Sequence, residues 1–247
     1  MRLRPLQHLL AGLSGSTPER DAPAPAADPA AAPGSLHVAT DRLFDEDAEF
    51  NYSADVAYPQ IEGGGPTIER VNAAIRDSVE AAAAYVRPDP TAFTGDPEQD
   101  RLLVGALEGG FTEPLLQDGL FSTRLDLSVY TGGAHPNHYA LPLTYDLTTG
   151  APVRLADLFR PDAAWRDTLA RLATDRLVAA RGSDWLFEVP IPAEALSTFT
   201  LGPDSLRLFF APYAIAPYAA GTSEVALSYE RLRDLLDPAG PTTRLLD

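Results

Sequence analysis

The chain has 247 residues, 45% of them hydrophobic, and carries a net charge of −16 from 35 acidic and 19 basic residues. This length suits one large or two small domains with a sizeable core. The acidic balance argues against nucleic acid or an anionic membrane surface as a partner, because both need a basic face. The sequence has no cysteine, which excludes disulfides, zinc–thiolate sites and cysteine nucleophiles. The acidic charge is compatible with a basic partner.

The first 35 residues predict a disordered spacer rich in alanine and proline, and a remnant of a signal segment is the alternative interpretation. Arg2 and Arg4 precede the short apolar segment LQHLLAGL, which is shorter than the apolar run of an export signal. Residues 17–34 are rich in alanine, proline and aspartate and show no periodicity, which is typical of disorder. No run reaches the ~18 apolar residues that a membrane-spanning helix needs. We expect the folded part to extend from about Ser35 to Leu236.

Apolar periodicity divides the first half of the folded part into strands around one helix. Pro59 is expected to end the first strand, and Pro66 to begin the helix. In chain order we expect a strand over 48–58, a helix over Thr67–Val86, a proline-rich loop over 87–97, and strands over 101–109, 119–131 and 139–147.

Apolar periodicity predicts strands and a helix in the second half of the folded part as well. A second amphipathic helix is expected from Pro161-Asp162 to Gly182. After it we expect a helical turn over 193–196, a hairpin of 199–201 and 206–210, a strand from Val225 and a short helix over 230–236. The order predicts an α+β fold, a mainly antiparallel sheet with two principal helices packed on it. We expect two α+β subdomains, over 36–150 and 151–247.

Two glycine-punctuated stretches carry a family resemblance. They are YTGGAHPNHYALPLTYDLTTG at Tyr130–Gly150 and FFAPYAIAPYAAGTSEVALSY at Phe209–Tyr229. With VRLADLF at Val153–Phe159, they resemble the PdaC/SigV-like domain and the adjoining domain of the lysozyme-sensing anti-sigma factor (RsiV-like) family, a domain of unknown function. The resemblance covers about Asp47–Leu236.

The resemblance implies a location outside the cytoplasmic membrane. One protein of that family binds lysozyme, and another is attached to a peptidoglycan deacetylase. This sequence contains neither a membrane-spanning run nor a deacetylase domain, so we do not carry over signalling or deacetylation. We expect a non-catalytic extracytoplasmic binding module that recognises cell-wall glycan or a wall-active protein such as a muramidase.

The sequence predicts a turn at Gly132 and Gly133 between two strands, which we call the glycine corner. The candidate ligand-binding residues in and around it are Tyr130, His135, Asn137 and His138. The two histidines could bind a metal, with Asp126 or Asp146 as a third, carboxylate ligand. The alternative, which we favour, is that His135 holds a buried corner by hydrogen bonds to the backbone and Asn137 caps the turn. We expect no cofactor and no metal. A small hydrolase that uses His135 is the competing class of function, and a purely structural envelope domain is the third.

Tyr213 and Tyr218 are the other candidate ligand-binding residues. Pro212 and Pro217 stiffen the loop that holds them, and exposed tyrosines on a rigid loop suit carbohydrate stacking or protein contact. The alternative is that both rings cover the edge of the sheet and complete the core. The sequence contains neither G-x-S-x-G nor G-x-G-x-x-G, so it provides no evidence for a serine hydrolase elbow or a dinucleotide site.

Overall fold

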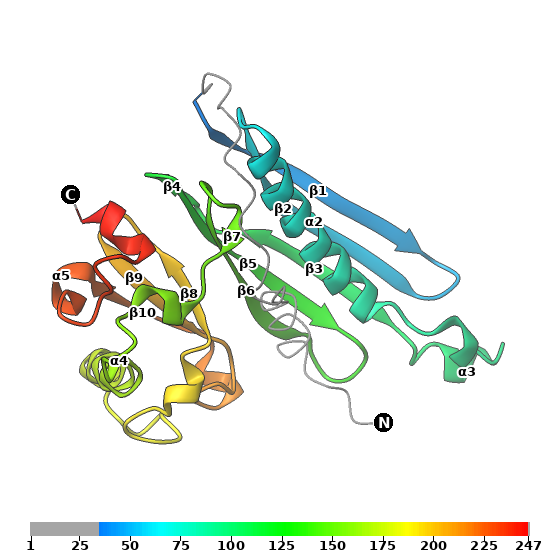
Figure 1. Ribbon diagram of the computed structural model, residues 1–247. Helices are drawn as coiled ribbons and strands as arrows, with labels where there is room; N and C mark the ends of the chain where they lie inside the picture. Colours follow the sequence, from blue (N-terminus) through cyan, green and yellow to red (C-terminus); the bar gives the residue numbers. More distant parts are fainter. Residues whose placement is uncertain (1–34, 247) are drawn as a thin grey trace. The chain divides into compact units, whose positions relative to one another are not determined.

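A computed structural model describes residues 35–246, and the α+β class is confirmed (Figure 1). The predicted spacer over 1–35 lies outside the described residues except for Ser35. The strands are β1 (His37–Asp47), β2 (Tyr52–Glu62), β3 (Gly105–Phe111), β4 (Leu115–Gln117), β5 (Leu120–Tyr130), β6 (Asn137–Asp146), β7 (Ala151–Pro152), β8 (Thr198–Leu201), β9 (Ser205–Phe210) and β10 (Ser223–Ser228). The α-helices are α2 (Pro66–Val86), α3 (Pro97–Asp100), α4 (Trp165–Arg181) and α5 (Tyr229–Leu232). Single 3₁₀ turns are η1 (Pro90–Ala92), η2 (Leu155–Leu158), η3 (Ala193–Ala195), η4 (Tyr218–Ala220) and η5 (Pro241–Leu245).

Within residues 35–246, the strands form two sheets. The larger has seven strands in the order β1-β2-β3-β5-β6-β7, with β4 paired to β5, and the smaller has the order β10-β9-β8. Strands β1 and β2 form a long antiparallel hairpin, from the pair His37–Glu62 to the pair Asp47–Tyr52. Strands β2 and β3 pair in parallel, because α2 and the loop after it connect them across the sheet.

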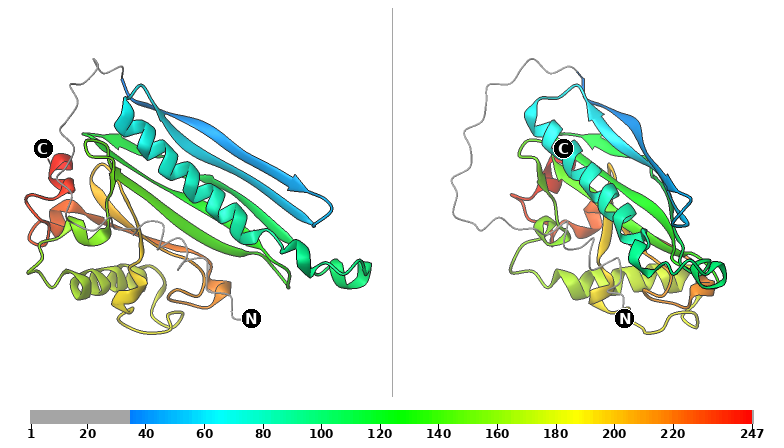
Figure 2. Two further views of the ribbon diagram at one scale, coloured as in Figure 1. Left: turned by 45° about the vertical axis from the view of Figure 1, so that its right-hand side comes forward. Right: turned by 90° about the vertical axis from the view of Figure 1, so that its right-hand side faces the viewer.

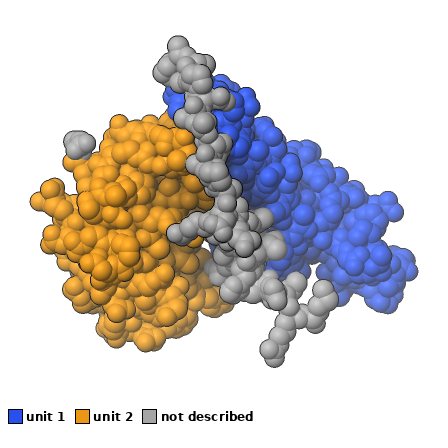
Figure 3. All heavy atoms as spheres, in the orientation of Figure 1, with its two compact units in different colours: residues 1–110, 127–139 blue, residues 111–126, 140–247 orange. Residues whose placement is uncertain are grey.

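The chain divides into two compact units, coloured separately in Figure 3. Of the described residues, unit 1 comprises residues 35–110 together with Leu127–Tyr139, and unit 2 comprises Phe111–Asp126 together with residues 140–246. The units interleave along the sequence, because β5 and β6 each contribute residues to both.

Unit 1 is built from β2 and the helix that follows it. Alternate residues of β2, among them Ala54 and Val56, are buried, as the period-2 pattern predicts. Helix α2 begins at Pro66 and buries a stripe that includes Val71, Ile75 and Val79. This stripe packs along β2, and both views in Figure 2 show the helix running beside the hairpin. The predicted helix is therefore confirmed to within one residue.

Unit 2 has its own apolar core, formed by α4 and the three-stranded sheet. The ring of Phe159 stacks on that of Trp165 at the start of α4, with centroids 4.7 Å apart. Helix α4 ends at Gly182, where φ is +77°, a conformation that glycine adopts without steric cost. The predicted hairpin is present as β8 and β9, and the residues that face α4 include Leu206 and Leu208, both fully buried.

Three features of the fold differ from the sequence prediction. The strand expected over 101–109 begins only at Gly105, as β3. Strand β1 was not predicted, because its side chains are exposed or half-buried on both faces and show no clean alternation. Pro59 does not end the second strand but pairs with Thr40 inside it. The parallel pairing of β2 with β3 ends at Val56, so Pro59 lies beyond it. On that side of β2, β3 needs no hydrogen bond from residue 59, and proline, which has no N–H, is tolerated there.

Candidate functional site

The predicted glycine corner between β5 and β6 is present in unit 1. Gly132 and Gly133 have φ values of +87° and +116°, so both occupy backbone conformations that disfavour side chains. A Cβ on Gly132 would also lie 3.3 Å from the carbonyl oxygen of Leu102. The Tyr130 hydroxyl donates a hydrogen bond of 2.9 Å to the Gly133 carbonyl oxygen and closes the corner.

The histidines of this corner are exposed. The Nδ1 atom of His135 lies 2.9 Å from the carbonyl oxygen of the adjacent Pro136, so the expected backbone contact exists. The expected burial was wrong, because His135 lies in an open turn with exposed neighbours on either side. Asn137 and His138 are the exposed first residues of β6. Within residues 35–246, no three histidine or acidic side chains are grouped so that they could hold a metal ion.

The loop after β9 holds Tyr213 in an unusual conformation. We call residues 211–221 the tyrosine loop. The Tyr213 amide donates to the Ala216 carbonyl oxygen at 3.1 Å, and the buried Ile215 anchors the turn between them. Tyr213 itself has φ +69° and is 60% exposed. Among the described residues, the other non-glycine residues with positive φ are Asn51 and Asp118, the types that tolerate this region best.

The two loop tyrosines lie together at the surface of unit 2. Their ring centroids are 5.5 Å apart with a 38° angle between the planes, and Tyr218 is half-buried. The Phe187 amide donates to the Ile215 carbonyl oxygen at 2.9 Å, which holds a second segment against the loop. Phe187 is 61% exposed and Val189 is 54% exposed. We call Phe187, Tyr213 and Tyr218 the aromatic patch.

Sequence reasoning missed Phe187 and Val189. They occur in the segment FEVPIP, where the charged Glu188 separates them and prolines follow. Bulky apolar residues in a stretch that fits neither a helix nor a long strand are the signal that could have found them. The predicted residues fall into two groups: Tyr130, His135, Asn137 and His138 belong to unit 1, and Tyr213 and Tyr218 to unit 2.

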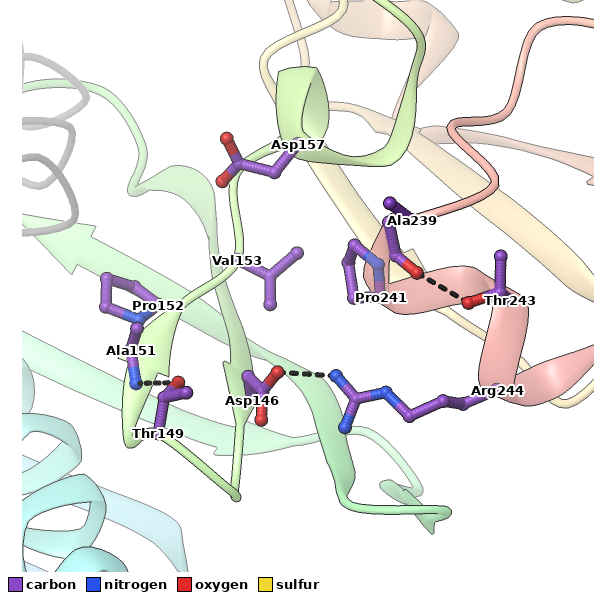
Figure 4. A pocket seen from close by; sticks show the side chains of 11 residues that line it. Asp146, Thr149, Ala151, Pro152, Val153, Asp157, Ala239, Pro241, Thr243 and Arg244 are labelled. Carbon is purple, nitrogen blue, oxygen red and sulfur yellow. Dashed lines mark hydrogen bonds and ion pairs between the residues drawn. The ribbon is translucent and has the colours of Figure 1, made fainter. Parts of the chain in front are cut away.

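A cavity of about 320 Å³ lies in unit 2, between the turn after β6 and the η5 turn (Figure 4). In Figure 4, Asp146 and Arg244 point toward one another, and Val153 projects between the two walls. The guanidinium of Arg244 donates to the Asp146 carboxylate at 2.5 Å. A Cβ on Gly240 would meet the Asp157 carbonyl oxygen at 3.1 Å, so the walls approach closely at that point.

The ionisation of Asp146 follows from these contacts. Burial alone would raise the pKa of the Asp146 carboxyl, but hydrogen bonds from Arg244 and Thr148 outweigh burial and hold the pKa below its ordinary value. Asp157, at another wall of the cavity, caps η2 and pairs with Arg154 at 3.1 Å. The Asp146 carboxylate is therefore ionised at neutral pH, and each of the two carboxylates has an arginine partner.

These features define an α+β protein with an exposed aromatic patch and a small polar cavity. Residues 156–230 match the family model described as "Protein of unknown function (DUF3298)". The fold is similar to the crystal structure of a member of the DUF3298 family from Bacteroides fragilis NCTC 9343. That structure is 18% identical, with a TM-score of 0.64, and the match covers 86% of this chain and 98% of that chain.

A DUF3298 family protein from Pseudomonas aeruginosa PAO1 is similar as well. It is 17% identical, with a TM-score of 0.58, and the match covers 89% of this chain and 97% of that chain. At these identities the likeness shows a shared fold. No curated protein matches this chain. Every helix within residues 35–246 is too short or too polar to cross a bilayer.

Proposed function

We propose that this chain is a non-catalytic, extracytoplasmic binding module and that the tyrosine loop forms its contact surface. The observation that carries the proposal is the conformation of Tyr213, with φ +69° and 60% of its surface exposed. A bulky residue in the left-handed region costs ~1–2 kcal/mol. An exposed ring recovers little of this cost by burial, so the side chain at 213 does little for folding. Strained, exposed side chains of this kind are typical of binding surfaces.

A protein partner accounts best for the aromatic patch. The exposed Phe187, on a segment bonded to the tyrosine loop, adds a third aromatic side chain to the two tyrosines, and aromatic side chains supply much of the energy of protein interfaces. The net charge of −16 favours a basic partner through electrostatic steering. A wall-active protein such as a muramidase combines these properties with the extracytoplasmic location that the family resemblance suggests.

Cell-wall glycan is the second candidate ligand. The observation that favours it is the adjacent pair of Tyr213 and Tyr218 rings, with centroids 5.5 Å apart. Tyrosine offers an apolar face against which the C–H side of a sugar can stack, and a hydroxyl that bonds to the sugar's oxygens. A hydrolase that uses His135 receives less support, because that histidine lies on an exposed turn with a contact to its own chain neighbour.

Titration calorimetry with the full chain tests the proposal. The ligands are a basic muramidase and soluble peptidoglycan fragments, and the variants are Tyr213→Asn and Tyr218→Ala. We expect the wild type to bind the muramidase, each variant to bind at least tenfold more weakly, and added salt to weaken binding. Binding of the fragments instead of the muramidase would favour the glycan candidate.

Leu102→Asn is the matched control, because Leu102 is a 66% exposed apolar residue in unit 1, far from the loop in sequence. The control should bind like the wild type. A wild type that binds neither ligand would overturn the recognition of wall components. Detection of the protein only in the cytoplasmic fraction of the source cells would overturn the proposed location.

A further inference from the structure

The cavity near Arg244 is separate from the tyrosine loop, since none of its lining residues falls in that loop. Its volume of about 320 Å³ lies at the lower end of the ~300–1,000 Å³ range of small-molecule sites. The cavity therefore suits a compact ligand of one or two rings. It is too small to serve as an interface with a protein partner.

The polar groups of the cavity are held in place before any ligand arrives. The Asp146 carboxylate accepts hydrogen bonds from the Thr148 amide and hydroxyl as well as from Arg244. Arg244 also lies within hydrogen-bond distance of the carbonyl oxygens of Asp118 and Gly119, at 3.4 and 3.5 Å. A site fixed in this way loses little conformational entropy when a ligand binds.

The lining carries two carboxylates, those of Asp146 and Asp157, and one guanidinium, that of Arg244. Asp146 pairs with Arg244, and Asp157 pairs with Arg154, which lies outside the lining. A free anion would meet two carboxylates, and a free cation would meet the guanidinium of Arg244. An uncharged ligand avoids both penalties. The carboxylates retain lone pairs that can accept hydrogen bonds, and Arg244 retains N–H groups that can donate them.

The remaining wall is apolar, with Pro152, Val153 and Pro241 among its residues. A purely apolar ligand would strip water from the carboxylates and the guanidinium without replacing its hydrogen bonds. We propose that this cavity binds a small, neutral, polyhydroxylated molecule, a saccharide of one or two rings. Its hydroxyls would bond to Asp146 and Arg244, and its C–H face would contact the proline and valine side chains.

The test is an NMR titration of the isotope-labelled full chain with glucose and with N-acetylglucosamine. We expect shifts confined to 146–157 and 239–244, and affinity that does not change with salt because the ligand is uncharged. Glucuronate and glucosamine, the acidic and basic analogues, should each bind more weakly than glucose. Tighter binding of either charged analogue would overturn the assignment of a neutral ligand.

Ala239→Leu places a larger side chain at an exposed lining position and should weaken sugar binding at least tenfold. Ala151→Leu, at a second exposed lining position, gives an independent test should the first variant not fold. Ala180→Leu, on the exposed face of α4, is the matched control and should bind normally.

Tyr213→Asn separates this proposal from the proposed function, because it changes the tyrosine loop alone. Sugar binding that survives Tyr213→Asn but is lost in Ala239→Leu supports the cavity. Sugar binding that is lost in Tyr213→Asn, or an absence of shifts up to the solubility of the sugars, overturns it.

Discussion

The Oγ atom of Ser122 accepts a hydrogen bond of 2.8 Å from the backbone amide of Leu201. Ser122 belongs to β5 of the larger sheet, and Leu201 to β8 of the smaller one. The same Oγ atom lies 2.8 Å from the hydroxyl of Thr144 on β6. All three residues are buried, so this polar junction joins the two sheets inside unit 2.

Removal of the Ser122 hydroxyl should destabilise unit 2. Ser122→Ala leaves a buried amide and a buried hydroxyl without this partner, which costs ~1–3 kcal/mol in the free energy of unfolding. Urea denaturation measures the loss. Ser53→Ala, at an exposed position of β2, is the control and should change stability by no more than ~0.5 kcal/mol. A loss for Ser122→Ala no larger than that of the control would contradict the role of the junction.

Tyr213→Asn should leave the stability unchanged or raise it slightly. Asparagine tolerates the left-handed region better than tyrosine, and the exposed ring contributes little burial. The neighbouring Ile215 is 3% exposed, so Ile215→Ala should lower the free energy of unfolding by ~2–5 kcal/mol. Thermal melting of both variants provides the comparison. Marked unfolding of Tyr213→Asn would show that the ring supports the fold.

Stability should fall in acid, partly through Asp146. The pKa of its carboxyl is lower in the folded chain than in the unfolded chain, so the unfolded state binds the proton more tightly. The stabilisation is therefore complete above the ordinary aspartate value of ~3.9 and is lost as the pH falls through the lower folded value. Urea midpoints measured across this range should fall less steeply in Asp146→Asn. Asp162→Asn, at an exposed aspartate, serves as the control.

His135→Ala should have little effect on the fold. The side chain is exposed and contacts the adjacent Pro136, so the change in the free energy of unfolding should stay within ~0.5 kcal/mol. Thermal melting tests this value, and elemental analysis of the purified wild type tests for metal. A loss above that value would restore a structural role for His135, and one equivalent of zinc lost in the variant would favour the hydrolase.

The sequence predicted the two principal helices closely, because each combines an apolar stripe with a clear boundary residue. Pro66 begins α2 and Gly182 ends α4, as expected. The positive φ values of Gly132 and Gly133 were predictable for a similar reason, since glycine occurs where other residues meet steric cost. Such features depend on residues that are close together in the sequence, and they can therefore be predicted from the sequence alone.

Features that depend on distant residues were not predictable. Arg244 meets Asp146 across 98 positions of sequence, and no local pattern marks either residue as part of a cavity. The conformation of Tyr213 contradicts its local preference, so propensity would have placed another residue there.

The hairpin of β1 and β2 has a consequence for the behaviour of the protein in concentrated solution. Within residues 35–246, β1 pairs only with β2, so its other side presents an open row of backbone donors and acceptors. Such an edge can recruit a strand from another molecule unless charge prevents it. Strand β1 has Asp41, Asp45, Glu46 and Asp47 against the single cation Arg42. Repulsion between the excess negative charges of two such edges opposes their pairing.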